Sequence, residues 1–554
     1  MARVVESIAR AMAEKFDGPL FGLMGDGNID LVTVWADVLG RPIVQARHEQ
    51  YAVAMADGYF RFSGKPGLCS VTQGPGLTNT ATSLVTARHH RSSVLLHAGQ
   101  SSLGDVHNPQ RFDQNTFATA TAGAGLQVES QQMVRPALDA AFRYIDSGQG
   151  PFVFSLPQDI QSLAQPESWI YEPPPVPSIH AAESDSIEHA ADILVGADRP
   201  VILAGNGAVH ANAAAAIASL SSHLGAPIVT SLLAKGLVRD HPNQAGVSGG
   251  MGNKRATRLL EEADVLLVLG ASLNQWTAEL SGPRQRRRII QVDRDPHNFG
   301  RQVRPILALE GDARLTTALI CQAVERRCEG KLRAPYAEAG PMSSLGPYFD
   351  ATNGDVDPRR AVDCLNAALP RDRLVVADGG HCVIAICQHL AVCHPRNWTY
   401  SFDFGCIGQG LALALGGCFA RPGRRVTLVT GDASLMMGLA ELDTAVRYRL
   451  PLTVIVLNDG GFGQERHSLR RKGFRPSLAD LPPPNFAGIA SAVGGHGENF
   501  HGQSGLSQLA SRLGEIEHRS GLFLADVPIN GAVELSASAE IARRLKGMDE
   551  SASH

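Results

Sequence analysis

The sequence of 554 residues has no long apolar run and almost no net charge. A helix that crosses a membrane needs about 20 consecutive apolar residues, and no stretch of this chain approaches that length. The 50 lysines and arginines are offset by 54 aspartates and glutamates, which gives a formal net charge of −4. No basic field therefore favours nucleic acid or a membrane surface, and we expect neither as a partner.

Cysteine is scarce, and its spacing excludes the common zinc motifs. None of the nine cysteines forms a Cys-x-x-Cys pair. An odd number of cysteines scattered among apolar residues predicts buried, reduced thiols. The N-terminal stretch MARVVESIARAMAEKF carries apolar residues at helical spacing, without the continuous apolar core of a signal peptide. Together these features predict a cytoplasmic protein.

Short apolar runs that alternate with helical patterns are abundant. Hydrophobic residues make up 44% of the chain, and such runs separated by helices are typical of parallel sheets covered on both faces. The alternation predicts an α/β fold of three doubly wound parallel-sheet domains, at residues 1–170, 185–328 and 355–535. Two linkers separate them: YEPPPVPS (171–178), whose consecutive prolines exclude a helix or a central strand, and a polar stretch at 328–353.

The third block contains a strand–helix–strand unit with a polar residue after each strand. VTLVT (426–430) precedes Asp432, and PLTVIVL (451–457) precedes Asn458. A right-handed crossover returns both strands parallel, so both side chains lie at the carboxyl edge of the sheet, where ligands bind. A carboxylate, an amide oxygen and a carbonyl that Gly460 lets the backbone turn inward suit Mg²⁺. The unit therefore predicts a metal site.

The segment between these two strands is predicted to be a single helix that begins beside an anion site. Gly431 and Ala433 are small enough for a diphosphate to approach the backbone, and a helix N-terminus favours anions. The alternative is an ordinary strand-end turn in which Asp432 or Ser434 caps the helix, but the spacing to Asn458 favours a cofactor site. The predicted apolar face of the helix comprises Leu435, Met436, Leu439, Leu442 and Val446.

Two motifs resemble those of a known superfamily. The pattern around Asp432 and Asn458 resembles the thiamine diphosphate motif, with Ala433 in place of its second glycine. RHEQYAVAMADGYFRFSGKPGLCSVTQGPGLTN (47–79) looks like the N-terminal signature of the acetolactate synthase and pyruvate decarboxylase superfamily. This resemblance implies pyrimidine-binding, central and diphosphate-binding domains, with thiamine diphosphate and Mg²⁺ as cofactors. It also implies a homodimer or homotetramer with sites at the subunit interface.

The resemblance assigns a catalytic role to Glu49. A carboxyl group shielded from water beside the pyrimidine ring donates to that ring and so promotes proton loss from the thiazolium carbon. The alternative is a surface glutamate at a helix start near Arg47. The implied metal ligands are Asp432, Asn458 and Gly460.

The resemblance also implies a set of cofactor contacts. In DFGCIGQG (403–410), Ile407 takes the place of the bulky apolar residue that bends the cofactor, and the Gly405 carbonyl would meet the pyrimidine amino group. The alternative is an ordinary Gly-rich helix entry. Besides Glu49, the implied cofactor-binding residues are Gly379, Gly380, His381, Gly405, Ile407, Gly431, Asp432, Ala433, Ser434, Asn458, Gly460 and Phe462.

The candidate substrate residues divide between two kinds of relative. Asp26, Asn28 and Glu465 match a pattern of pyruvate decarboxylases, whereas Gln110 looks more like the corresponding segment of acetolactate synthases. Gln73 is either an oxyanion donor or a strand-end amide that satisfies backbone groups. The His-His pair of the decarboxylases is absent from its place. The resemblance therefore implies cleavage or formation of a carbon–carbon bond on a 2-oxo acid or related small carbonyl substrate, with an acetolactate synthase-like carboligase favoured.

Three alternatives stay open: a non-oxidative decarboxylase that releases an aldehyde, a hydrolase of a cyclic dione, and a non-catalytic homologue. The presence of Glu49, Asp432 and Asn458 argues against the last. GASLNQW (270–276) departs from the corresponding run of flavin-containing relatives, so we expect no FAD in the central block.

Overall fold

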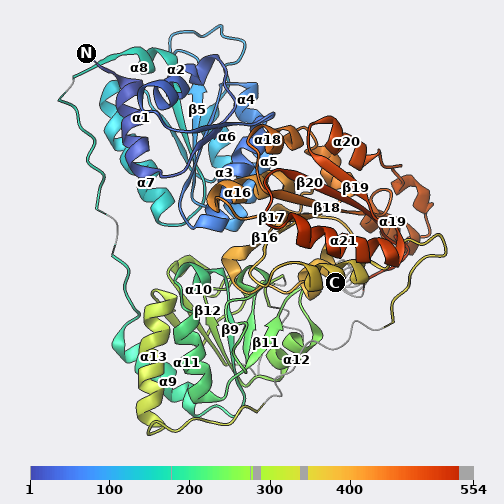
Figure 1. Ribbon diagram of the computed structural model, residues 1–554. Coiled ribbons are helices and arrows are strands. Elements are labelled where there is room, and N and C mark those ends of the chain that lie inside the picture. The colour runs from blue at the N-terminus through green and yellow to red at the C-terminus, as the bar shows by residue number, and fades with distance from the viewer. Residues whose placement is uncertain are drawn as a thin grey trace.

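The computed structural model describes residues 2–166, 168–175, 178–274, 276–278, 288–336 and 347–535. Within these ranges the chain forms three six-stranded sheets, one in each of three α/β domains (Figure 1). All strand pairs within these sheets are parallel. The predicted fold class is therefore confirmed, whereas the predicted domain bounds stay a prediction.

The N-terminal and C-terminal sheets share one strand order. The N-terminal sheet runs β3-β2-β4-β5-β7-β6 and the C-terminal sheet β16-β15-β17-β18-β20-β19, so both place their first strand between the second and the third. Connections on opposite sides of that first strand diverge, and this switch point is where open α/β sheets bind ligands. The N-terminal strands are β2 Leu20–Gly22, β3 Ile43–Gln45, β4 Gly67–Val71, β5 Val94–Gln100, β6 Gly125–Gln127 and β7 Phe152–Pro157. The C-terminal strands are β15 Leu374–Ala377, β16 Trp398–Tyr400, β17 Val426–Gly431, β18 Leu452–Asn458, β19 His496–Asn499 and β20 Leu522–Pro528.

The central sheet has a different order, β11-β10-β9-β12-β13-β14, which is the order of dinucleotide-binding folds. Its strands are β9 Pro200–Ala204, β10 Ile228–Thr230, β11 Gln244–Val247, β12 Val265–Leu269, β13 Arg288–Asp293 and β14 Leu307–Glu310. A separate antiparallel pair joins β1 (Ala2–Arg3) to β8 (Ala164–Gln165).

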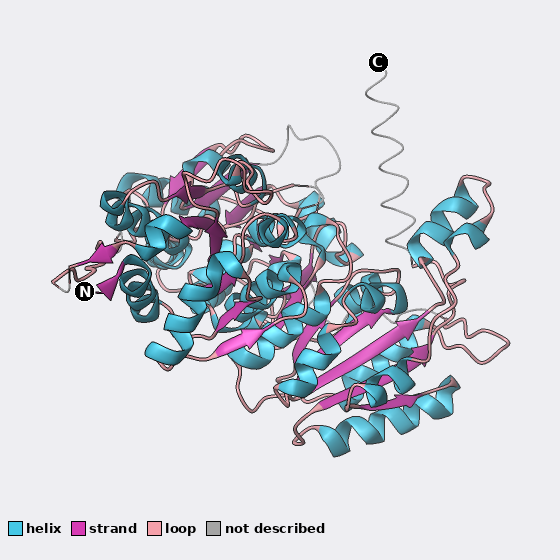
Figure 2. Ribbon diagram, turned by 90° about the horizontal axis from the view of Figure 1, so that it is seen from above, coloured by secondary structure: helices cyan, strands magenta, loops and turns pink. Residues whose placement is uncertain are grey.

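Helices cover both faces of the sheets (Figures 1 and 2). Every residue of the apolar strands β12 and β18 is buried, as expected for parallel strands enclosed between helical layers. The N-terminal helices are α1 Val4–Lys15, α2 Ile29–Thr33, α3 Glu49–Ser63, α4 Pro75–Thr78, α5 Ala81–His90, α6 Gln114–Thr121, α7 Val134–Asp146 and α8 Gln158–Ser162. The central helices are α9 Ser184–Val195, α10 Asn206–His210, α11 Ala214–Leu224, α12 Lys254–Glu262 and α13 Ala313–Arg327. The C-terminal helices are α14 Pro358–Ala368, α15 Val383–His389, α16 Gly410–Ala420, α17 Asp432–Met437, α18 Glu441–Arg447, α19 Gly463–Arg471, α20 Phe486–Ala492 and α21 Gly502–Ile516.

Two sequence predictions about local structure are confirmed. The amphipathic N-terminus forms α1, and the described residues of both predicted linkers form no helix or strand. All nine cysteines are free, as predicted, but only five of them are buried; Cys328, Cys364, Cys393 and Cys406 are partly exposed. Among the residues that the structure describes, no helix is long and apolar enough to cross a membrane.

The single helix predicted after Gly431 is wrong. The chain forms two helices, α17 and α18, and α17 ends at Gly438. A Cβ on Gly438 would lie 3.2 Å from the Gly408 carbonyl oxygen and 3.4 Å from the Tyr51 ring. This close approach favours a glycine, and glycine weakens the helix at this point. As a result, Met436 is 44% exposed and does not belong to the predicted apolar face.

Glycines bring helices α3 and α16 into close contact and so join the N-terminal domain to the C-terminal domain (Figure 1). A Cβ on Gly58 would lie 2.2 Å from Leu413 O, and a Cβ on Gly416 would lie 2.0 Å from Met55 O. Any larger residue would therefore separate the two helix backbones. This helix pair fixes how the two domains sit in one chain.

A buried ionic network joins the same two domains. The Arg61 guanidinium forms two hydrogen bonds of 2.7 Å with the Asp57 carboxylate on its own helix. It also donates to Asp403 Oδ2 at 2.8 Å and to the Tyr400 carbonyl at 2.8 Å in the C-terminal domain. The Arg61 side chain is 1% exposed and that of Asp403 is 5% exposed. These carboxylates raise the pKa of Arg61, even though burial lowers it.

Arg61→Met is expected to lower the free energy of unfolding by about 3–5 kcal/mol, because it leaves two buried carboxylates without their counter-ion. Arg3→Met is the matched control: its ion pairs are at the surface and should be worth about 1 kcal/mol or less. Urea unfolding followed by circular dichroism measures both variants. Equal small losses in the two would show that the Arg61 network contributes no more than a surface pair.

Candidate active site

The ends of β15 and β17 are tied together by Asp378, which is 1% exposed. Its Oδ1 accepts from Ser401 Oγ at 2.5 Å and from the Gly379 and Gly408 amides at 2.8 and 3.2 Å. Its Oδ2 accepts from Thr430 Oγ1 at 3.2 Å. Burial raises the pKa of this carboxyl, while the four donors counteract the rise. Asp378 thereby holds the turns that surround the carboxyl edge of the sheet.

A large cavity of about 1230 Å³ opens at this edge. Its walls come from the C-terminal domain and the central domain, with a smaller contribution from α5. The predicted site residues that line it are Gly379, Gly380, His381, Gly405, Ile407, Gly431, Asp432, Ala433, Ser434, Phe462 and Glu465. Eleven residues predicted from scattered motifs are therefore brought together in one cavity.

Two buried carboxylates face each other where β17 and β18 end. Asp432 is 3% exposed, and burial raises its pKa against the opposing effect of nearby backbone amides, including those of Ala433 and Gly461. Burial and the charge of Asp432 raise the pKa of Asp459 to about 7. Both carboxylates would be stabilised by a cation bound between the strand ends.

The Asn458 amide is oriented by a neighbouring strand. Asn458 Nδ2 donates to Asp526 Oδ1 at 3.0 Å, which leaves Oδ1 of Asn458 as the acceptor. The Gly460 amide donates to that Oδ1 at 3.2 Å. The Gly460 carbonyl, by contrast, accepts from the Leu481 amide at 2.9 Å and from Arg466 at 3.2 Å. These two bonds occupy its lone pairs, so it would serve as a metal ligand only by exchanging one of them.

The glycines around the cavity leave open space where a side chain would stand. A Cβ on Gly405 or Gly380 would meet nothing within 4 Å, and one on Gly431 would meet only the Gly379 carbonyl at 3.8 Å. At Gly379, in contrast, a Cβ would lie 2.5 Å from Ile407 Cγ2. The missing side chain at Gly379 is what allows Ile407 to project beside the cavity.

His381 forms part of a buried imidazole pair. Its ring lies 4.6 Å from that of His467 on α19, and both residues are almost fully buried. His381 Nε2 donates to the Val533 carbonyl at 2.5 Å. Burial lowers the pKa of each imidazole to about 4, so both are neutral at physiological pH. Ser434 Oγ donates to the Gly379 carbonyl at 2.7 Å and fixes the turn that leads to His381.

Glu49 lies elsewhere, at the carboxyl edge of the N-terminal sheet. Its side chain is 14% exposed and its Oε2 accepts from Asn79 Nδ2 at 3.0 Å. Arg47 does not pair with it, because Arg47 forms an ion pair of 2.6 Å with Asp443. Glu49 is the first residue of α3, as the alternative of a helix-start glutamate predicts, but Arg47 is not its partner. A Cβ on Gly76 would lie 3.7 Å from Glu49 Oε1, so this glycine keeps the carboxylate accessible.

Two glutamines lie at the same edge as Glu49. Gln73 is 1% exposed, and its Nε2 donates to Gln110 Oε1 at 2.8 Å. Gln73 Oε1 is buried without a hydrogen-bond partner among the described residues. Asp26 is exposed and accepts from Gln158 Nε2 at 2.7 Å.

Asn28 is fully buried and cannot contact a substrate in this conformation. Its Oδ1 accepts from the Gly25 amide at 2.8 Å, and its Nδ2 donates to Ser70 Oγ at 2.9 Å and the Leu23 carbonyl at 3.2 Å. All three bonds fix the loop that carries Asp26, so Asn28 positions this loop.

The N-terminal group and the cavity are two separate half-sites within one chain. Glu49, Gln73, Gln110 and Asp26 come from the carboxyl edge of the first sheet, and none of them lines the cavity. The cavity has the residues suited to a diphosphate and a cation, but no general acid–base of the N-terminal group. Within one chain, the two groups therefore do not form a single site.

The cavity fits a divalent cation together with a phosphate-bearing cofactor. Among the residues described, no cluster of three or more His, Cys, Asp or Glu could hold a metal alone. Mg²⁺, however, is commonly bound by one or two carboxylates, water and ligand phosphates. This donor set is matched by the facing carboxylates of Asp432 and Asp459 and by the oriented amide oxygen of Asn458. The open space above Gly431 leaves room for a phosphate.

Sequence reasoning missed Asp378, Asp459, Asp526 and His467. Asp378 and Asp526 each follow an apolar strand, as Asp432 does, and this shared signal could have found them. Asp459 is adjacent to the predicted Asn458. His467 has no comparable signal, because it is a single histidine in a polar helix.

Three family models match the chain, one for each domain. They are the N-terminal TPP binding domain of thiamine pyrophosphate enzymes at residues 2–122, the central domain at 187–320, and the C-terminal TPP binding domain at 378–527. Thiamine pyrophosphate (TPP) is another name for thiamine diphosphate. The central range contains its whole sheet, the first range lacks β6 and β7, and the last range lacks β15 and the final residue of β20.

Curated proteins and a solved structure are similar along most of the chain. A probable 2-ketoarginine decarboxylase of Pseudomonas aeruginosa is 31% identical over 511 residues, covering 88% of each chain. An acetolactate synthase large subunit of Escherichia coli is 27% identical over 563 residues, covering 95% of each. A thiamine diphosphate-dependent 4-hydroxybenzoylformate decarboxylase of Rhodococcus jostii superposes with a TM-score of 0.82 at 21% identity, over 96% of this chain and 99% of that one. The last similarity shows the fold alone.

Proposed function

Since the chain belongs to the thiamine pyrophosphate enzymes, we propose that it is an acetolactate synthase-like carboligase, which cleaves and forms carbon–carbon bonds beside the carbonyl of a 2-oxo acid or related small compound. The observation that carries the proposal is the cavity lined by Asp432 directly after β17, with Asn458 at the end of the adjacent strand β18, beside the lining residues Leu457 and Asp459. These are the positions that a diphosphate and its cation require.

The residues of the cavity would hold the cofactor in a defined pose. Asp432 and the Asn458 oxygen would bind Mg²⁺, while the turns at Gly379–Gly380 and Gly431 would admit the diphosphate. Ile407, supported against Gly379, would set the angle between the two rings. Bound thiamine diphosphate supplies the electron sink for the bond that is cleaved.

Glu49 would supply the proton transfer from the second half-site. Because Asn79 donates to Oε2, Oε1 is the oxygen placed to exchange a proton with a ring nitrogen. Its low exposure would fall further when another chain covers it, which strengthens the interaction by excluding water. Gln73 and Gln110 form one amide pair beside it and would orient a substrate oxygen.

The choice of carboligase over decarboxylase rests on the polar groups of the N-terminal half-site. Amide groups at Gln73 and Gln110 position an oxygen without supplying a proton, whereas release of an aldehyde needs a proton donor. Glu465, exposed in the cavity, and the exposed Asp26 of the N-terminal half-site favour the decarboxylase as a second candidate. Relatives of both kinds match the chain.

Product analysis distinguishes the two candidates. The protein with thiamine diphosphate and Mg²⁺ is incubated with a panel of 2-oxo acids, each with and without an acceptor aldehyde or a second 2-oxo acid. A carboligase gives a hydroxyketone or acetohydroxy acid that requires both carbonyl compounds. Aldehyde as the sole product would favour the decarboxylase, and absence of any cofactor-dependent product would contradict both. An absorbance spectrum of the purified protein tests the further prediction that no flavin is bound.

The active form is expected to be a dimer or a dimer of dimers. A symmetric pair would place Glu49 of each chain opposite the cavity of the other, completing both sites. Sedimentation velocity under assay conditions, combined with activity across a dilution series, measures this. A fully active monomer would contradict the two-half-site arrangement. Cytoplasmic location likewise stays a prediction.

A further inference from the structure

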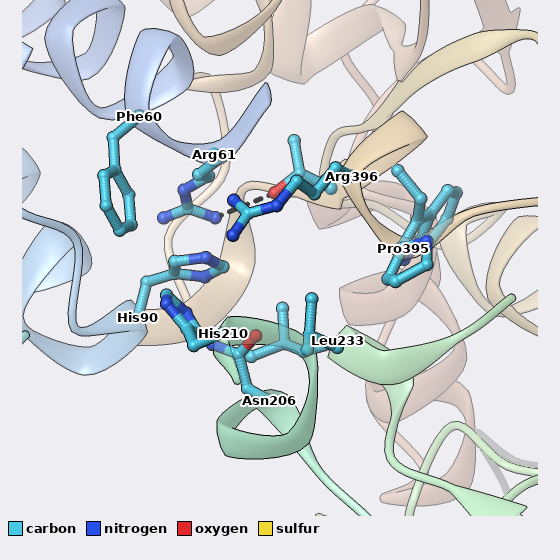
Figure 3. Close-up of a pocket in the computed structure, with 11 residues that line it drawn as sticks. Phe60, Arg61, His90, Asn206, His210, Leu233, Pro395 and Arg396 are labelled. Atoms are coloured by element: carbon cyan, nitrogen blue, oxygen red, sulfur yellow. Dashed lines mark hydrogen bonds between the residues drawn. The ribbon is translucent and has the colours of Figure 1, made fainter. Parts of the chain in front are cut away.

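A second, much smaller cavity lies where the three domains of one chain meet (Figure 3). Its volume is about 20 Å³. The N-terminal domain contributes Phe60, Arg61 and His90, and the central domain contributes Asn206 and His210 among others. The C-terminal domain contributes Arg396. This junction is not part of the cofactor site, and no residue of the proposed mechanism lines it.

The two arginines of the junction differ in how their charges are balanced. Arg61 is neutralised by Asp57 and Asp403, as described above. Arg396 is half-buried, and its guanidinium has no hydrogen bond or ion pair with any described residue. Figure 3 shows this guanidinium extending from the C-terminal domain toward Arg61 and His90. The N–H donors of this guanidinium therefore have no acceptor among the residues that the structure describes.

The Arg396 side chain is held in this place by the end of helix α3. A Cβ on Gly64, which has a positive φ of 74°, would lie 2.5 Å from one terminal nitrogen of Arg396. The glycine that ends the helix therefore makes room for the guanidinium. Burial lowers the pKa of Arg396, and the nearby Arg421 lowers it further. The charged guanidinium of Arg396 is thus partly buried without a carboxylate nearby to stabilise it.

Other side chains show that the surroundings are electropositive. Burial, together with the charges of His90, Arg396, Arg294 and Arg91, lowers the pKa of His210 to about 3. His210 is stacked on the Phe60 ring, with 5.8 Å between ring centroids, so it cannot turn away from these charges. His90 lies 3.4 Å from Asp403 and Arg91 pairs with Asp295, so Arg396 is the junction arginine whose charge no described carboxylate balances. A positive charge of this kind in a confined space favours an anion.

The size of the cavity limits which anion fits. A volume of about 20 Å³ on this measure holds about one ordered water molecule or an ion only slightly larger, because about 10–15 Å³ suffices for a water. We propose that the three-domain junction is a binding site for a small monovalent anion, chloride in the cell, held by the Arg396 guanidinium with the Asn206 amide and His210 at its sides. Phosphate, carboxylate ligands and larger anions are excluded by volume.

An anion at this point would connect the three domains. Arg396 follows α15 and precedes β16, Asn206 and His210 form the two ends of α10, and His90 ends α5. Without an anion, the positive groups on these segments repel one another. Bound chloride would attract all of them and so reduce this repulsion. The consequence is that chloride stabilises the docking of the central domain onto the other two.

Crystallisation of the full-length protein in sodium bromide tests occupancy directly, since bromide is close in size to chloride and scatters anomalously. We expect an anomalous difference peak in the junction, within hydrogen-bonding distance of Arg396. A junction that contains only water, or anomalous peaks confined to the protein surface as adventitious ions, would overturn the proposal. This measurement uses the unmodified protein and does not depend on a variant that folds.

Thermal unfolding tests the linkage to stability. At equal ionic strength, chloride should raise the midpoint of the first unfolding transition by about 2 °C relative to gluconate, which is too large to enter. Arg396→Gln should abolish this difference, whereas Arg258→Gln, which alters a surface pair on α12, should retain it. A chloride effect that persists in Arg396→Gln, or is missing from the unmodified protein, contradicts the assignment.

Discussion

Glu49→Gln is expected to reduce turnover by at least about 100-fold, the lower end of the contribution of a positioned acid–base group. Glutamine preserves the shape of the side chain and its bond with Asn79, but it cannot exchange a proton with the cofactor ring. Cofactor affinity should change little, because the proposed diphosphate and metal contacts belong to the other half-site. The rate of hydrogen–deuterium exchange at the thiazolium carbon of bound cofactor should fall together with turnover.

Glu14→Gln is the matched control, since Glu14 is an exposed glutamate on α1 of the same domain. Calorimetric titration with thiamine diphosphate and Mg²⁺ shows whether both variants still bind cofactor. If Glu49→Gln exchanged deuterium and turned over near the rate of the unmodified protein, Glu49 would have only a structural role. A large loss of cofactor affinity in this variant would instead contradict the proposal that one half-site binds the diphosphate and the metal while the other supplies the proton transfer.

Asp432→Ala is expected to weaken thiamine diphosphate binding by at least about 100-fold, the upper end of the effect of changing an outer-shell partner of a metal ligand. The substitution removes one of the few protein oxygens available to the cation. Turnover should be lost at ordinary cofactor concentrations. Titration calorimetry with and without Mg²⁺ measures both the affinity and its dependence on the metal.

The same substitution should not destabilise the protein without cofactor. After burial, the charge of Asp432 is the main cause that raises the pKa of Asp459, so removing this carboxylate relieves a repulsion. The unfolding midpoint without cofactor should therefore hold steady or rise, while the upward shift on adding cofactor disappears. Asp372→Asn, at a residue whose side chain is 66% exposed, should leave both midpoints unchanged. Unaltered cofactor affinity in Asp432→Ala would refute the metal assignment.

Much of the cofactor half-site was predictable from sequence because its signals are local. An apolar run followed by Gly-Asp, and a second apolar run followed by Asn, occupy adjacent strands in the structure, with Gly431 paired in register with Leu457. Strand direction alone places Asp432 and Asn458 at one edge, since parallel strands end together. The turns at Gly379 and Gly405 were predicted by resemblance and line the same cavity.

The partners of these residues were not predictable in the same way. Asn458 is oriented by Asp526, which is 68 residues away in the chain, because β20 lies beside β18 in the sheet. Arg61 meets Asp403 across 342 residues through the contact of two domains. No periodicity in either segment points to the other, so the pairs follow only from the order of strands and the docking of domains.

The sequence by itself determined the α/β class, the alternation of buried strands and helices, and the identity of the residues at the strand ends. These depend on hydrophobic periodicity and on short motifs, which consecutive residues encode. Only the tertiary structure decided that α17 stops at Gly438, that Asn28 is buried, and that Glu49 and Asp432 occupy separate half-sites. The physical reason is that each of these outcomes depends on close contacts between distant segments, such as Tyr51 against Gly438. A pattern of consecutive residues does not predict which distant segments come into contact.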